Sequence, residues 1–145
     1  MNSKPDVPRS QTAAAIRRPR PGITHDNRFF WPGVKEGRLL IQRCESCKQL
    51  RHPPAPMCSG CRCLEWDTVQ SSGRGTVYSY VQHYYPNIPP FEPGHAVAVV
   101  ELEEGTRLVS DRAGIDGDDV TTGLCVQVEF NAVDEELTLA PFRPC

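Results

Sequence analysis

The sequence has no long apolar run and no recognisable catalytic motif. No stretch of its 145 residues approaches the roughly 20 apolar residues that a membrane-spanning helix needs, and the N-terminus lacks the apolar segment of a secretion signal. It also lacks a glycine-rich phosphate loop and a serine or cysteine nucleophile beside a histidine base. We therefore expect a soluble, cytoplasmic protein without catalytic residues of its own, whose thiols are reduced or bound to metal.

Charge is distributed unevenly, although the whole chain carries a net charge of only −2. Residues 1–43 contain nine Lys or Arg against three Asp or Glu, and residues 44–68 contain three of each kind. Residues 69–145 contain four Lys or Arg against twelve Asp or Glu, a net charge of −8. The C-terminal half therefore lacks the excess of cations with which proteins bind a nucleic-acid backbone.

Five of the seven cysteines fall within residues 44–63, and four of them form two C-x-x-C pairs: Cys44 with Cys47, and Cys58 with Cys61. Two such pairs supply the four soft ligands that tetrahedral zinc prefers, a stronger metal signal than the single C-x-x-C of a redox motif. Disulfides suit a small secreted domain, and the cysteine count here is odd. The spacing predicts one structural zinc ion per chain, with iron in the same cage as the main alternative.

The remaining cysteines and one histidine are not expected to bind the metal. Cys63 breaks the C-x-x-C spacing, and His52 lies in the loop between the two pairs, before Pro53. Cys125 falls among alternating apolar residues and is expected to be a small buried side chain. Cys145 ends the chain and is expected to be exposed and without a role.

Three regions follow from the residue pattern. Residues 1–22, rich in Pro and Arg, are expected to be a flexible arm or linker whose basic run Arg17, Arg18 and Arg20 is solvated. Residues 23–68 should hold a short helix and the zinc ribbon. A cap is expected at Thr24 or Asp26, with Pro32 kinking or shortening the helix and a strand following at 38–43.

The third region, residues 69–145, has the alternation of β-strands. Five strands with a longer connection between the third and fourth predict a five-stranded OB-fold barrel, and hence a mainly β protein. The expected strands are residues 73–85, 95–103, 106–111, 125–133 and 136–142.

The first of these strands and the loop after it hold all four tyrosines of the chain. Strict alternation places Val77, Ser79 and Val81 on one face and Tyr78, Tyr80, Gln82 and Tyr84 on the other. Residues 84–95 contain four prolines, so we expect a stiff projecting loop. Its aromatic residues either pack against the barrel or form the wall of a groove for a ligand or partner.

Several short motifs, taken in order, resemble a known family. They are F-W-x-G-x-x-x-G at residues 30–37, L-x-x-x-R-C ending at Cys44, G-x-G-T-V-Y-S at 73–79, V-E-L-x-E-G-x-R-L at 100–108 and F-R-P at 142–144. Residues 24–144 thus resemble the acyl-CoA-associated OB-fold family with a rubredoxin-like zinc ribbon, formerly a domain of unknown function.

The resemblance implies a function as well as a fold. Members of this family accompany thiolase-superfamily enzymes, including the lipid-transfer-protein-like aldolases that cleave steroid side chains, and some are fused behind hot-dog-fold enoyl-CoA hydratases. It implies a non-catalytic accessory subunit that helps to form the site for an acyl-CoA thioester. In this sequence the candidate residues for a CoA or partner groove are Tyr78, Tyr80, His83, Tyr84, His95 and Arg107.

Two other functions compete with this one. OB barrels and zinc ribbons often bind single-stranded nucleic acid, and the tyrosines could stack on bases. The net charge of −8 on residues 69–145 disfavours that function, and no nucleic-acid or membrane partner is expected. Rubredoxin-like electron transfer would require iron in the four-cysteine site.

Overall fold

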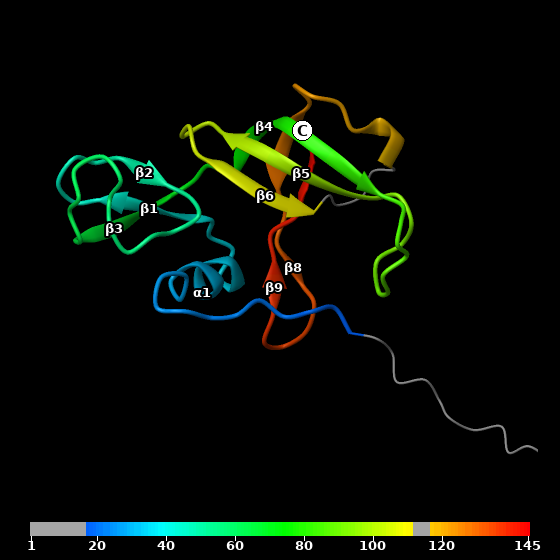
Figure 1. Ribbon diagram of the computed structural model, residues 1–145, viewed down its shortest axis with the longest axis horizontal. Coiled ribbons are helices and arrows are strands. Elements are labelled where there is room, and N and C mark those ends of the chain that lie inside the picture. The colour runs from blue at the N-terminus through cyan, green and yellow to red at the C-terminus, as the bar shows by residue number, and fades with distance from the viewer. Residues whose placement is uncertain (1–16, 112–116) are drawn as a thin grey trace, which may run out of the picture.

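The computed structural model describes residues 17–111 and 117–145. It is mainly β, as predicted, and the one α-helix of the described residues, α1, spans Phe30–Lys35 (Figure 1). No helix in these two ranges is both long and apolar enough to cross a membrane. The strands are β1 (Leu40–Cys44), β2 (Leu50–Arg51), β3 (Trp66–Gln70), β4 (Arg74–His83), β5 (His95–Leu102), β6 (Arg107–Asp111), β7 (Cys125–Val128), β8 (Asn131–Ala132), β9 (Thr138–Leu139) and β10 (Phe142–Pro144), with a 3-10 turn at Gly117–Asp119.

The zinc ribbon is built on a three-stranded antiparallel sheet in the order β2-β1-β3. The predicted strand at 38–43 corresponds to β1, which pairs Cys44 with Trp66 of β3. Arg43 and Asp67, also paired across these strands, form two hydrogen bonds of 2.8 and 2.5 Å. This sheet holds Cys44 at its end, where the metal-binding loops begin.

The OB-fold region contains a five-stranded antiparallel sheet in the order β10-β7-β4-β5-β6 and a small β8-β9 hairpin. The first three predicted strands are β4, β5 and β6. The predicted strand at 125–133 divides into β7 and β8, and the one at 136–142 into β9 and β10. The loops after β7 and β9 let the chain leave the main sheet for the hairpin and return to it.

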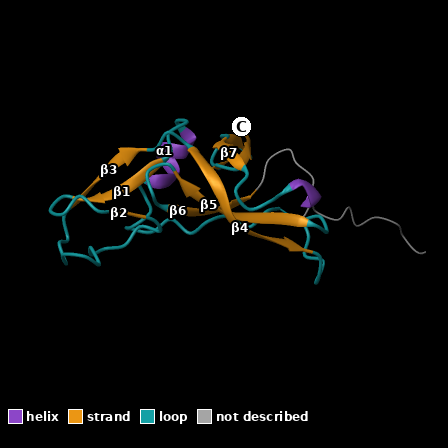
Figure 2. Ribbon diagram, turned by 90° about the horizontal axis from the view of Figure 1, so that it is seen from above, coloured by secondary structure: helices purple, strands orange, loops and turns teal. Residues whose placement is uncertain are grey.

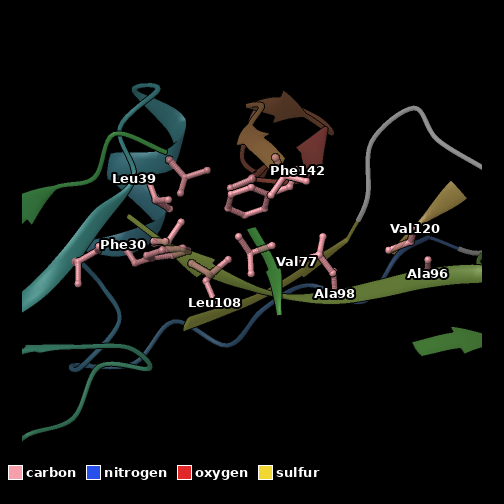
Figure 3. Packing of buried hydrophobic residues seen from close by; sticks show 14 residues of the cluster. Phe30, Leu39, Val77, Ala96, Ala98, Leu108, Val120 and Phe142 are labelled. Carbon is pink, nitrogen blue, oxygen red and sulfur yellow. The ribbon is translucent and has the colours of Figure 1, made fainter. Parts of the chain in front are cut away.

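One hydrophobic core joins the ribbon to the OB-fold region. Phe30 and Val34 of α1 and Leu39 and Ile41 beside or on β1 belong to the same cluster as the buried face of the large sheet. Figure 3 shows Phe30 and Leu39 among side chains of the OB-fold region, including Leu108 and Phe142. Helix α1 lies where the two sheets meet (Figure 2).

The start of α1 differs from the prediction. Its N-cap is Phe29, which makes no side-chain cap hydrogen bond, so neither Thr24 nor Asp26 is the cap. Because the helix begins only at Phe30, Pro32 falls in the first turn, where its missing N–H is not needed. The helix ends just before Gly37, which has a φ of +75°, in the left-handed region that glycine tolerates best.

The predicted division of the tyrosines between two faces is wrong because β4 contains a bulge. Val77 pairs with Val100, but the next paired residue is Ser79, so Tyr78 is the extra residue. Beyond the bulge the alternation is shifted, and Tyr80, which pairs with Ala98, shares the face of Val77. We call the opposite side of β4, β5 and β6 the outer face; Val81 lies on it.

Cys125 was expected to be buried, and Cys145, whose exposure is as expected, was expected to have no role. Both are exposed, and they form a disulfide. Antiparallel pairing of β7 with β10 brings these residues together, and the amide of Cys145 donates to the carbonyl of Cys125 at 3.1 Å. The two cysteines are 20 positions apart in the sequence, and this spacing alone gave no reason to pair them.

The basic run of the N-terminal region is not simply solvated. Arg18 forms an ion pair with Asp111 at the end of β6, and Arg20 forms one with Asp134 in the β8-β9 turn. Arg18 and Arg20 therefore hold this segment against the end of β6 and against the β8-β9 turn of the acidic OB-fold region. Residues 1–16 of the predicted arm lie outside the described residues.

Candidate metal centre and adjoining pocket

Four thiols converge at the end of the ribbon. The sulfur atoms of Cys44, Cys47, Cys58 and Cys61 all lie within 4.8 Å of one another, and the Cys44–Cys61 and Cys47–Cys58 sulfur pairs are 3.5 Å apart. Tetrahedral zinc with bonds of about 2.3 Å separates its sulfur ligands by about 3.8 Å. The donor type, number and spacing therefore fit zinc, and four protein ligands leave no open coordination position for a substrate.

The two C-x-x-C loops have the same backbone geometry. The amide of Lys48 donates to the Cys44 carbonyl at 3.1 Å, and that of Arg62 donates to the Cys58 carbonyl at 2.9 Å. Lys48 and Arg62 have positive φ angles of 63° and 65°. Each loop thus turns sharply after its second cysteine and directs both sulfurs to one point.

Backbone amides prepare two of the thiols for metal binding. The Cys47 amide is the main cause that lowers the pKa of Cys44, to about 6, and the Cys61 amide is the main cause that lowers the pKa of Cys58. The pKa of Cys47 is raised to about 12: the Gln49 amide lowers it, but the hydrogen bond with Cys58 and burial raise it more. Cys44 and Cys58 therefore favour the thiolate, while Cys47 would lose its proton on metal binding.

Cys63 lies outside the four-sulfur cluster. Its backbone carbonyl accepts a hydrogen bond from the Cys58 amide at 2.9 Å. In the first loop the Gln49 carbonyl accepts the equivalent bond from the Cys44 amide. Its thiol lies 3.6 Å from the Glu65 carbonyl. Cys63 thus contributes its backbone to the second metal-binding loop, and its sulfur faces away.

An apolar cavity of about 360 Å³ opens where the barrel does not close completely. β6 and β10 are the two edges of the large sheet, and the Ser110 hydroxyl reaches across to the Ala140 carbonyl at 2.7 Å. We call this space the seam pocket. It is lined by Asn27, Phe30, Trp31, His52, Pro53, Pro54, Val97, Leu108, Val109, Ser110, Asp111, Leu139, Ala140 and Pro141.

Two of the residues with polar groups that line the seam pocket, Trp31 and His52, lie on the side of the helix and the ribbon. Nε1 of Trp31 is buried and has no hydrogen-bond partner among the described residues. His52 packs against Phe30 with ring centroids 5.6 Å apart, and burial lowers its pKa. Mostly apolar walls with one neutral imidazole suit a ligand that is itself mostly apolar. Sequence analysis missed this pocket because its walls come from separate segments.

The six predicted groove residues do not form one groove. Arg107 stacks on Tyr78, 3.6 Å from the ring centroid, near the start of β4, and also hydrogen-bonds Glu101 at 2.9 Å. His83 and His95 pair at the other end of β4 and β5, with Tyr84 next to them, while Tyr80 lies on the opposite face. None of the six lines the seam pocket.

His95 belongs to a small cluster at the loop end of the outer face. Its Nε2 lies 3.0 Å from Asp111, which also pairs with Arg18, and its ring packs against Phe91 with centroids 5.0 Å apart. Burial, with Arg18 and His83 nearby, lowers the pKa of His95. This favours a neutral ring that donates to Asp111, so the cluster links the β4-β5 loop to the end of β6.

Two family models match this chain: the ChsH2 rubredoxin-like zinc ribbon domain over residues 31–65 and the ChsH2 C-terminal OB-fold domain over residues 68–131. The chain belongs to the ChsH2 family. The family match confirms the predicted order of zinc ribbon and OB-fold, and it identifies the four-cysteine cluster as that of a zinc ribbon.

Curated relatives share much of this sequence. A probable enoyl-CoA hydratase alpha subunit of Thermomonospora curvata is 50% identical over 88% of this chain, and the 3-oxo-4,17-pregnadiene-20-carboxyl-CoA hydratase alpha subunit of Mycobacterium tuberculosis is 40% identical over 77%. This chain spans only 40% and 35% of the length of these two proteins. A DUF35 domain-containing scaffold protein of Methanocaldococcus jannaschii is 32% identical, with 73% of this chain and 77% of that protein covered.

One solved structure is closely similar to the ChsH2-type fold described here. It is a chain of the Ltp2-ChsH2(DUF35) aldolase, 49% identical, with a TM-score of 0.81. The match covers 86% of this chain and 98% of that one.

Proposed function

We propose that this chain is a non-catalytic accessory subunit of a thiolase-superfamily acyl-CoA enzyme, and that the enzyme is a lipid-transfer-protein-like aldolase of steroid side-chain degradation. The observation that carries this proposal is the match to nearly the whole of one chain of the Ltp2-ChsH2(DUF35) aldolase. The M. jannaschii relative, named a scaffold protein, supports a helper role. The two hydratase alpha subunits support an acyl-CoA substrate and a hydratase as a second partner.

We propose that one zinc ion, held by Cys44, Cys47, Cys58 and Cys61, is structural. A zinc ribbon of this size cannot bury a core of its own, so metal binding supplies much of its stability. The ribbon carries Leu39 and Ile41 into the shared core. Zinc would thereby fix the loop with His52 and Pro53 against the OB-fold region, where it forms one wall of the seam pocket.

The seam pocket is the part of the chain that best suits the acyl-CoA thioester. Its volume is at the lower end of the range for small-molecule sites, so it suits a segment of such a ligand better than the whole molecule. Apolar walls would cover an acyl or pantetheine segment and exclude water.

Assembly with an aldolase subunit tests this function. The chain is co-expressed with the Ltp2 subunit of the solved aldolase, and the product is examined by size-exclusion chromatography with light scattering. We expect one complex that contains both proteins in a fixed ratio. If the two proteins elute separately at micromolar concentrations, the proposed partner class is wrong.

A further inference from the structure

We propose that an exposed apolar patch on β4 and the β4-β5 loop is the surface through which this chain docks on its partner enzyme. The patch consists of Val81, Tyr84, Tyr85 and Ile88, and we call it the loop patch. The proposal rests on the accessory-subunit function above and adds the place of contact. The occupant is the apolar, uncharged surface of the enzyme subunit.

Exposed apolar side chains are concentrated in this part of the molecule. Eleven large apolar side chains are exposed among the described residues, and six of them fall within residues 78–88. In the loop patch the exposed fractions are 64% for Val81, 57% for Tyr84, 89% for Tyr85 and 49% for Ile88. Soluble proteins rarely expose such side chains together unless the surface binds something.

The chain segment that carries the loop patch is poor in charge, and Arg18, which lies over the Phe91 ring of this loop, is already paired with Asp111. Residues 79–100 contain one charged residue, Glu92, although residues 69–145 as a whole contain sixteen. Depletion of charge with enrichment of tyrosine is typical of the centre of a protein–protein interface. The stretch has no Lys or Arg to attract anionic lipid or a nucleic-acid backbone.

The loop holds its exposed side chains in place through its own backbone. The Gly94 amide donates to the His83 carbonyl at 2.8 Å, and the Phe91 amide donates to the Ile88 carbonyl at 3.0 Å. Phe91 turns back onto His95, whereas Tyr85 and Ile88 remain outside. A loop ordered in this way and rich in proline loses little conformational freedom on docking, which favours tight binding.

The position of the loop patch leaves the other sites free. The β4-β5 loop lies at the end of the OB-fold region far from the zinc ribbon (Figure 1). None of the four side chains lines the seam pocket. A partner could therefore contact the loop patch while the ribbon and the pocket keep their own contacts.

A matched pair of variants tests the docking surface. The first carries Tyr84→Ser, Tyr85→Ser and Ile88→Ser; the second carries Met57→Ser and Leu64→Ser, which removes two exposed apolar side chains of the zinc ribbon. All five side chains are exposed, so both variants should fold, as circular dichroism and zinc content would verify. Affinity for the purified Ltp2 subunit of the solved aldolase is measured by isothermal titration calorimetry.

We expect the dissociation constant of the loop variant to rise at least about tenfold, and that of the ribbon variant to change by less than about twofold. If the loop variant binds as tightly as the native chain, the docking surface is wrong while the accessory function stands. If the native chain itself does not bind, the proposed partner class fails and the docking proposal with it. Binding of the native chain to phosphatidylcholine vesicles that the loop variant loses would make the patch a membrane contact and overturn the proposal.

Discussion

The carboxylate of Glu104 accepts a hydrogen bond from the hydroxyl of Ser71 at 2.8 Å. Ser71 lies between the last ribbon strand, β3, and the first strand of the large sheet, β4, while Glu104 lies in the β5-β6 turn. The same carboxylate accepts the Ser72 amide at 2.7 Å, and the Ser71 amide donates to the Leu39 carbonyl at 2.8 Å. One acidic side chain thus ties the connection between ribbon and barrel to the barrel.

Replacement of Glu104 should loosen this connection. Because Ser71 is buried, Glu104→Ala would leave its hydroxyl and the Ser72 amide without their acceptor. We expect the free energy of unfolding to fall by about 1–3 kcal/mol, as urea denaturation would measure. Glu129→Ala removes an exposed carboxylate of the same region and serves as the control. Equal free energies of unfolding for the two variants would show that the Ser71–Glu104 contact does not stabilise the fold.

The second glycine of the G-x-G motif should tolerate no side chain. A Cβ atom on Gly75 would lie 2.4 Å from the Glu101 carbonyl oxygen and 2.9 Å from a Val100 methyl, and the carbonyl is backbone of the paired strand β5. Gly75→Ala should therefore force β4 and β5 apart and lower stability by roughly 3 kcal/mol or more.

Gly22→Ala provides the comparison for that variant, since a Cβ there meets nothing within 4 Å. Thermal unfolding followed by circular dichroism should show a clear drop for Gly75→Ala alone. A normal melting temperature for Gly75→Ala would contradict the close approach of the two strands.

Removal of one metal ligand should abolish zinc binding, whereas removal of Cys63 should not. Cys58 is fully buried in the four-sulfur cluster, and the Cys63 sulfur faces the Glu65 carbonyl. We expect about one zinc ion per chain in the native protein and in Cys63→Ser, and a large loss of both zinc and folded ribbon in Cys58→Ser. Metal analysis of the purified proteins measures this, and loss of zinc in Cys63→Ser would contradict the assignment.

Stability should decrease as the pH falls through the normal range of histidine. Burial places the pKa of His52 below 6.5 in the folded protein, so on acidification the unfolded chain takes up its proton first. This contribution to stability is present above pH 6.5 and is lost progressively as the pH falls below it.

His52→Gln should therefore lose less stability than the native protein between pH 7.5 and pH 5.5 in urea denaturation. His25→Gln, which replaces a mostly exposed histidine, should behave like the native protein. The same pH dependence in all three proteins would show that His52 is not the group responsible.

Features with their own local chemistry could be predicted from the sequence. The spacing of Cys44 to Cys61 is sufficient to indicate a metal site, and alternation with glycine-rich turns located the strands of the OB-fold region. The bulge at Tyr78 could not be predicted, because it adds one residue without changing the apolar pattern. It moved Tyr80 to the other face and divided the predicted groove.

Contacts between distant segments were equally inaccessible to sequence analysis. Arg18 and Asp111 are 93 residues apart, and charge patterning alone gave no reason to pair them. The seam pocket depends on how far β6 stands from the segment before β10, a matter of packing geometry. These features became apparent only when the tertiary arrangement was known.

The most direct test of the accessory role is a reconstituted cleavage assay with three samples: the chain alone, the aldolase subunit alone, and both together. The account predicts that the chain alone does not turn over an acyl-CoA substrate, that the aldolase subunit alone has little activity, and that mixing restores it. Turnover by the chain alone, or equal aldolase activity with and without it, would contradict the account.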